Sequence, residues 1–145
     1  MPASRSQAYE DILSLLTTAW VTTAGQSASL IKWENVANKS VPPAAGTAWC
    51  RATVRHVTSR QASLAGATGT RRFRRTGVLT VSVFYPSGTG LPGDTDLAKI
   101  IMDAYEGVTS SNGVIFYDVT INEIGPDGDF YMVNVVANFE YDEIK

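Results

Sequence analysis

Residues 131–141, with the sequence YMVNVVANFEY, have the clearest periodicity in the chain. Apolar side chains occupy every second position of this stretch, namely Tyr131, Val133, Val135, Ala137, Phe139 and Tyr141. A period of two places these side chains on one face of a β-strand. The strand-like stretch 114–124 comes before it, and the turn sequence GPDGD at 125–129 joins the two. Because proline and glycine set the backbone angles of tight turns, the pattern predicts a β-hairpin with arms of about ten residues.

Two further strand-like stretches lie in the middle of the chain. Residues 49–57, WCRATVRHV, alternate so that one face holds Cys50, Ala52, Val54 and His56. Residues 77–85, GVLTVSVFY, are rich in β-branched and aromatic side chains, which favour strands. Between them, 58–69 is rich in small and polar residues and RRFRR follows at 71–75, so we expect a basic connection between two long strands. Residues 29–35 are compatible with one additional short strand.

Apolar residues at helical spacing predict two helices. The first covers residues 6–20, where serines 4 and 6 can cap the first turn and one stripe holds Tyr9, Ile12, Leu13, Leu16 and Trp20. The second begins at Asp94 or Thr95 as the expected cap and ends near Gly107, and its stripe holds Leu97, Ile100, Ile101, Ala104 and Tyr105. The order of these elements predicts an α+β fold, with a mainly antiparallel sheet of four to five strands and two helices packed on one face.

Length and composition limit the classes of protein that fit. A chain of 145 residues with 44% apolar and 18% charged residues suits one globular domain, so we expect a single domain over 1–145. The uncharged stretches 12–31 and 76–93 are too polar or too interrupted by proline and glycine to span a membrane, and we expect no membrane partner. Cys50 is the single cysteine, which excludes a disulfide framework and fits a reducing compartment.

No arrangement of residues indicates catalysis or cofactor binding. Cys50 and His56 lie on one predicted strand but roughly 20 Å apart, too far for a nucleophile and its base. The acidic pairs Asp94–Asp96 and Asp127–Asp129 occupy a helix start and a tight turn, where acids are expected for local reasons. The glycines at 88, 90 and 93 are a weak match to a phosphate-binding loop, because an acid follows them directly. We therefore expect no enzyme activity, no cofactor and no metal site.

Charge is distributed unevenly along the chain. The net charge is −2, yet residues 35–93 carry eight Lys or Arg and no acid, and residues 94–145 carry eleven acids against two lysines. Such asymmetry indicates an anion-binding face, or two faces that attract each other between copies of the chain. The densest basic cluster is the candidate interaction site, with Phe73 between its members Arg71, Arg72, Arg74 and Arg75. A contact with nucleic acid and a contact with protein are both open for this cluster.

Four segments together resemble one protein family. They are WENV at 33–36; PP at 42–43 leading to WCRATV at 49–54; GVLTVSVF at 77–84 with GTG at 88–90; and GPDGDFY at 125–131 with NV at 134–135 and FEYD at 139–142. In this order they are similar to the tail-terminator proteins of long-tailed bacteriophages, and the lambda minor tail protein U is similar in fold class.

The resemblance implies a structural virion protein and no enzyme. It implies a hexameric ring that caps the tail tube, ends tail polymerisation and offers a docking face to the head connector. The expected partners are other copies of the chain, the tail tube protein and the head–tail connector protein, with DNA only as cargo through the ring. The expected location is the head-proximal end of the virion tail, after assembly in the host cytoplasm.

The uneven charge fits a ring, because ring contacts join two different patches of neighbouring subunits. We favour a protein interface over the lumen for the arginine cluster, since lumenal arginines would bind phosphates and slow the DNA. Two alternatives stay open: a head–tail connector or tail-completion protein of the same virion, and a small nucleic-acid-binding module.

Overall fold

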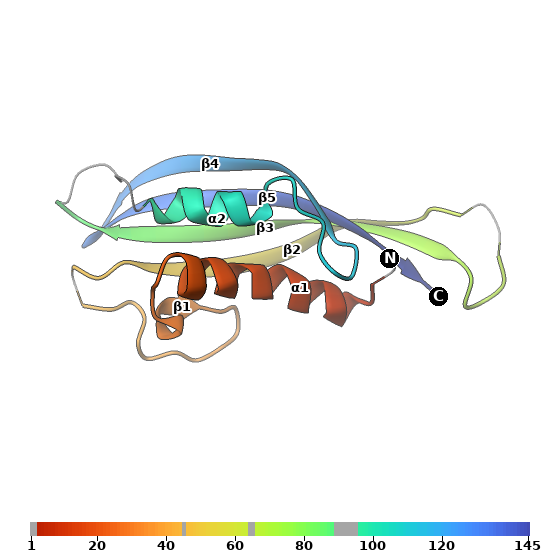
Figure 1. Ribbon diagram of the computed structural model, residues 1–145, viewed down its shortest axis with the longest axis horizontal. Coiled ribbons are helices and arrows are strands. Elements are labelled where there is room, and N and C mark those ends of the chain that lie inside the picture. Colours follow the sequence, from red (N-terminus) through yellow and green to blue (C-terminus); the bar gives the residue numbers. More distant parts are fainter. Residues whose placement is uncertain (1–2, 45, 64–65, 89–95) are drawn as a thin grey trace.

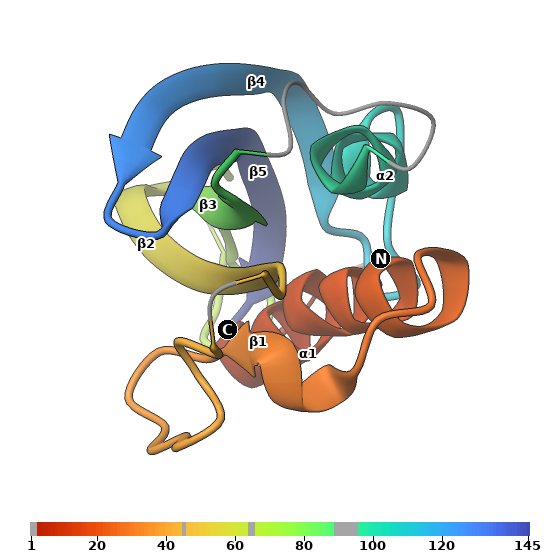
Figure 2. The same ribbon diagram turned by 90° about the vertical axis from the view of Figure 1, so that its left-hand side faces the viewer.

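The computed structural model describes residues 3–44, 46–63, 66–88 and 96–145, and it contains one five-stranded sheet with two helices on one face (Figures 1 and 2). In chain order the elements are α1 (Arg5–Thr17), β1 (Ile31–Lys32), β2 (Trp49–Gln61), β3 (Arg72–Pro86), α2 (Leu97–Tyr105), β4 (Ile115–Asp127) and β5 (Phe130–Ile144). The strand order across the sheet is β1-β2-β3-β5-β4, and only the β1–β2 pair is parallel. The predicted α+β fold class is confirmed.

The two helices begin at side-chain caps. Ser4 and Gln7 form a reciprocal capping box at α1, in which the Gln7 N–H donates to Ser4 Oγ at 3.3 Å and the Ser4 N–H donates to Gln7 Oε1 at 2.9 Å. The predicted caps Asp94 and Thr95 of the second helix lie outside the described residues; the cap is Asp96, which accepts from the N–H groups of Ala98 and Lys99. Gly107, with φ of +72°, follows the end of α2 as predicted.

The first helical segment is longer than predicted. After α1, a π-helical turn continues over Thr18–Thr23, and a 3₁₀ turn at Ala28–Leu30 precedes β1. The predicted strand at 29–35 is therefore reduced to two residues, because Asn35 takes a positive φ of 57° that ends the extended backbone.

The C-terminal hairpin is confirmed, but its turn is shorter than predicted. Residues 125–127 belong to β4 and pair with 130–132 of β5, so that only Gly128 and Asp129 remain between the strands. Pro126 is tolerated in β4 because β4 is an edge strand, and an edge residue needs no donor on its open side. Two irregularities, between Tyr117 and Thr120 and near Gly125, bend β4 strongly (Figure 2).

The β2–β3 hairpin corrects the predicted position of the basic cluster. β2 continues to Gln61 and β3 starts at Arg72, so eight of the eighteen residues in the expected connection over 58–75 belong to strands. With the end of β5 they form a part of the sheet that projects beyond the helices (Figure 1). Arg72, Arg74 and Arg75 are strand residues and do not lie in a loop. The sequence pattern does not predict this extension of β2, because residues 57–61 are exposed on both faces and lack the period of two of a half-buried strand.

Two apolar clusters cover the two faces of the sheet. The large one lies between the helices and the sheet, and it includes the predicted inward face of β5 and the fully buried Ile12, Leu16 and Trp20. The smaller one, on the opposite face, consists of Val41, Trp49, Phe84 and Phe130. Trp49 and Phe84, which pair across β2 and β3, stack with ring centroids 4.1 Å apart. Val41 brings the segment after β1 into contact with this cluster.

Asp11 joins α1 to the connection between α2 and β4. Its carboxylate accepts hydrogen bonds at 2.9 Å from both the backbone N–H and the side-chain amide of Asn112, and another from the Ser110 hydroxyl. This buried carboxylate therefore links α1 to the connection that follows α2. Among the described residues, no helix has both the length and the apolar character needed to cross a membrane.

Candidate interaction surface

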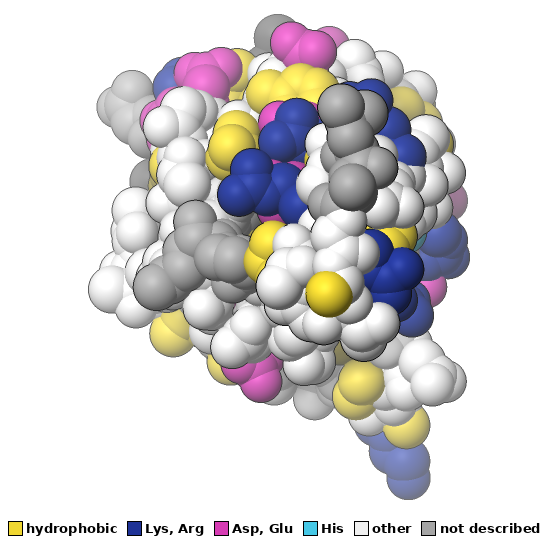
Figure 3. All heavy atoms as spheres, turned by 90° about the vertical axis from the view of Figure 1, so that its right-hand side faces the viewer, with side chains coloured by type: hydrophobic (Ala, Val, Ile, Leu, Met, Phe, Trp, Pro, Cys, Tyr) yellow, Lys and Arg dark blue, Asp and Glu magenta, His cyan; other side chains and the backbone are white. Residues whose placement is uncertain are grey.

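The four arginines predicted as an interaction site lie together at one end of the sheet. Three of them come from the start of β3, Arg71 immediately precedes that strand, and the last residues of β5 run beside them. Figure 3 looks at this end and shows Lys and Arg side chains gathered on it. The structure thus brings the four residues into one region.

Two of the four arginines are bound within the subunit. Arg74 forms a bidentate ion pair with Asp142, which lies directly opposite on β5. Its Nε donates to Oδ1 at 3.0 Å, and a second guanidinium nitrogen donates to Oδ2 at 3.2 Å. The hydrogen bonds from Arg74 lower the pKa of the Asp142 carboxyl. Arg75 donates to Glu143 at 2.9 and 2.6 Å and also contacts Ser59 of β2.

The Arg75–Glu143 pair is well shielded, with side-chain exposures of 16% and 23%. Because it joins β3 to β5 and touches β2, it holds together the three strands of the projecting end. The sequence did not point to Asp142 and Glu143 as partners, since the pairing of β5 with β3 depends on the strand order and not on local pattern.

The other cations of this end are more available to a partner. Arg72 is 55% exposed and reaches Asp142 only at 3.6 Å. Arg60 of β2 is exposed, and Lys145 follows β5. The Phe73 ring lies among the charged groups of Arg71, Arg75 and Lys145, whose distances to its centroid are 6.0, 5.8 and 5.4 Å.

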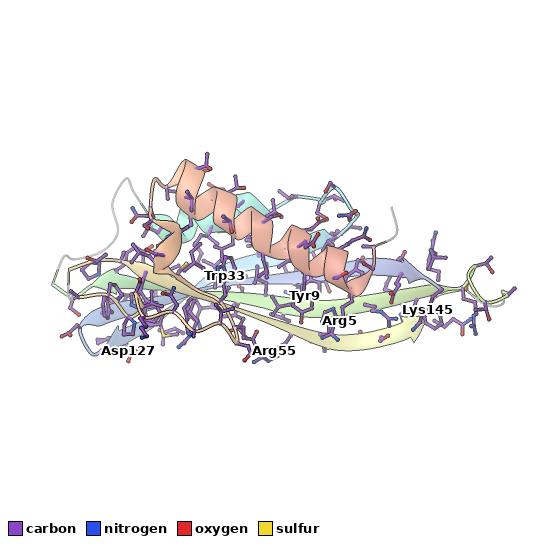
Figure 4. All side chains as sticks on the ribbon, turned by 90° about the horizontal axis from the view of Figure 1, so that it is seen from below. Arg5, Tyr9, Trp33, Arg55, Asp127 and Lys145 are labelled. Carbon is purple, nitrogen blue, oxygen red and sulfur yellow. The ribbon has the colours of Figure 1, made fainter. Side chains whose placement is uncertain are left out.

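Two exposed acids, Asp127 and Asp129, lie at the opposite end of the sheet. Figure 4 shows Asp127 at one end and Lys145 at the other. Asp127 and Asp129 flank the β4–β5 turn, and both are exposed. The acidic block of the sequence is therefore divided: Asp142 and Glu143 neutralise the arginines inside the subunit, and the residues of the β4–β5 turn lie far from them.

His56 lies at a groove between α1 and β2. The groove is lined by Arg5 and Tyr9 from α1, Glu34 and Asn35 from the segment after β1, and Val54, Arg55 and His56 from β2 (Figure 4). His56 Nε2 is 2.7 Å from the Tyr141 hydroxyl, and burial, with the charges of Arg5 and Arg75, lowers the pKa of the imidazole. This residue is thus neutral at neutral pH, which fits its place among aromatic rings.

The candidate nucleophile Cys50 is not placed for catalysis. Cys50 is fully buried, and burial raises the pKa of its thiol, so the thiolate needed for nucleophilic attack is disfavoured. Within the described part of the chain, no group of three or more His, Cys, Asp or Glu side chains is placed to hold a metal ion.

The chain is similar to known proteins in sequence and in fold. A sequence model of the family described as phage tail terminator protein matches residues 11–138. One solved protein chain shares the fold, with a TM-score of 0.56 over 91% of this chain and 94% of that chain at 20% sequence identity. A search of curated proteins finds no match.

Proposed function

Since the chain belongs to the phage tail terminator family, a group of structural tail proteins, we propose that it forms a hexameric ring on the head-proximal end of the tail tube. The ring stops further addition of tube protein and presents the surface to which the head connector docks. The observation that carries this proposal is the family match over residues 11–138, which spans nearly all of the secondary structure.

The charge distribution of the subunit supports a ring. Exposed cations, including Arg60 and Arg72, lie at one end of the sheet, and the exposed acids Asp127 and Asp129 lie at the other. A subunit with two different complementary patches associates head to tail, and such contacts close into rings when the rotation between neighbours allows it. The internal pairing of Arg74 and Arg75 leaves fewer free cations for phosphate binding, which disfavours a nucleic-acid-binding module.

Light scattering on the purified protein at low and high salt tests the ring. We expect a species of six times the subunit mass of 15.6 kDa at low salt, and a smaller mass at high salt because screening weakens contacts between exposed charges. A DNA-binding assay beside it is expected to show only weak binding. A protein that stays monomeric at all concentrations, and also on added tail tubes, would refute the proposal.

A further inference from the structure

The outer edge of β2 is open over the projecting part of the strand. β1 pairs only with Cys50 and Arg51 of β2. Farther along the same edge, the Glu34 carboxylate accepts a hydrogen bond from the Val54 N–H at 3.2 Å. From His56 to Gln61, the described residues give the strand no ladder partner on its outer side, and on the other side all of these residues except the bulged Val57 pair with β3.

The opposite edge of the sheet is open as well. β4 is the last strand in the order and pairs with β5, and beyond that pairing the described residues show only one isolated bridge, between Thr109 and Ile115. From Tyr117 to Asp127, the backbone groups on the outer side of β4 therefore have no ladder partner within the described chain. Open strand edges with unpaired N–H and C=O groups are ready templates for another strand.

Exposed apolar side chains are concentrated on these two edges. Among the described residues, five large hydrophobic side chains are exposed, and four of them belong to β2 or β4: Val57 at 65%, Ile124 at 56%, Ile115 at 44% and Tyr117 at 40%. Both edges carry charged residues, and β4 also has Pro126 and two bulges, all of which protect a free edge. The large exposed apolar side chains beside them are the feature that indicates a partner in the assembled state.

The charges of the two edges are complementary. The open part of β2 carries Arg60 and no acid, whereas β4 carries Asp118, Glu123 and Asp127 and no base. Two β2 edges or two β4 edges would bring like charges together, while β2 against β4 brings opposite charges together. A β2–β4 contact uses two different surfaces of the subunit, which is the kind of contact that a ring requires.

We propose that neighbouring subunits join edge to edge, with β4 of one copy lying alongside residues 56–61 of β2 in the next copy. The sheet then continues from subunit to subunit, Val57 and the exposed apolar side chains on the facing stretch of β4 gain neighbours, and both open edges gain ladder hydrogen bonds. This inference rests on the proposed ring and identifies the surfaces that build it.

Charge reversal on each edge provides the test. Arg60→Glu alters the β2 edge, and Glu123→Lys with Asp127→Lys alters the β4 edge. All three residues are exposed, and none of them forms an ion pair with another described residue. Each altered edge is expected to raise the protein concentration needed for ring formation by about tenfold or more. The combined triple variant is expected to recover ring formation. Matched controls are Lys39→Glu and Glu10→Lys, which reverse exposed charges away from both edges and are expected to assemble like the wild type.

A mixing experiment sharpens the test. An equal mixture of Arg60→Glu and Glu123→Lys/Asp127→Lys is expected to form rings, because every contact in an alternating ring then joins opposite charges. Thermal unfolding checks that the variants remain folded, and Arg60→Gln, which removes the charge without reversing it, gives a smaller shift in the same direction if Arg60→Glu does not fold.

The outcomes separate the two proposals. If the wild type forms rings and both edge variants form them equally well, the edge contact is wrong and the ring stands. If the wild type forms no ring, alone or on tail tubes, both proposals fail.

Discussion

Replacing Gly77 with alanine is expected to lower the free energy of unfolding by about 3 kcal/mol or more. Gly77 lies in β3 between His56 of β2 and Phe139 of β5. A Cβ added there would stand 2.4 Å from the backbone oxygen of Arg55 and 2.4 Å from Cζ of Phe139. Both distances are far below van der Waals contact, so the strands must separate or the ring must leave its place.

Urea denaturation of the Gly77→Ala variant measures this loss. Val78→Ala, at the neighbouring half-buried position on the other face of β3, is the control and is expected to cost much less. Adding Phe139→Leu to Gly77→Ala relieves only the collision with the ring, because the collision with the Arg55 carbonyl remains. We therefore expect no recovery of stability in the double variant. A Gly77→Ala protein as stable as the wild type would show that the three central strands are not packed as described.

Replacing Arg75 with glutamate is expected to cost about 2–4 kcal/mol of stability. The change places a carboxylate beside Glu143, in a site where both side chains are largely shielded from water. It also removes the contact with Ser59 and the charge near the Phe73 ring. Thermal or urea unfolding of Arg75→Glu measures the effect.

The charge-swapped variant Arg75→Glu/Glu143→Arg tests whether the lost ion pair causes the loss of stability. It restores an ion pair between β3 and β5, and we expect it to recover a large part of the lost stability. Arg72→Glu is the matched control within the same cluster: its side chain is 55% exposed, so its effect on stability is expected to stay within about 1 kcal/mol. Equal losses from Arg72→Glu and Arg75→Glu would contradict the division of the cluster into structural and exposed arginines.

This division changes how the basic cluster relates to function. The sequence placed Arg71, Arg72, Arg74 and Arg75 in one exposed connection, and their role at an interface stays a prediction. Arg74 and Arg75 are held by carboxylates of the same chain, so reversing all four charges together would unfold the projecting end as well as alter its surface. Arg60 and Arg72 are the better probes of assembly.

Much of the fold could be predicted from local pattern. The alternation in 131–141 gave β5 and its inward face, and the apolar stripe around Ile12 and Leu16 gave the first helix. These elements were predictable because each packs one face against the core, which imposes a period on the sequence. The turn predicted over 125–129 is too long, because Gly125 and Pro126, which are common in turns, lie in a bent edge strand here.

The surface could be predicted only in part. Residues 57–61 of β2 are all exposed, so they lack the period of two of a half-buried strand, and their sequence pattern predicts a connection. The pairing of the arginines with Asp142 and Glu143 depends on the position of β5 between β3 and β4, which no local pattern encodes. The two open edges of the sheet also follow from the strand order, so local sequence pattern does not predict them.

Electron microscopy of tails tests the central claim, tail termination by a ring, most directly. Tails assembled without this protein are compared with the same tails after purified protein is added, and both are then supplied with free tube protein. We expect the treated tails to carry a ring at one end and to stop growing, and the untreated tails to lengthen. Treated tails that carry no ring and grow as fast as untreated tails would contradict the account.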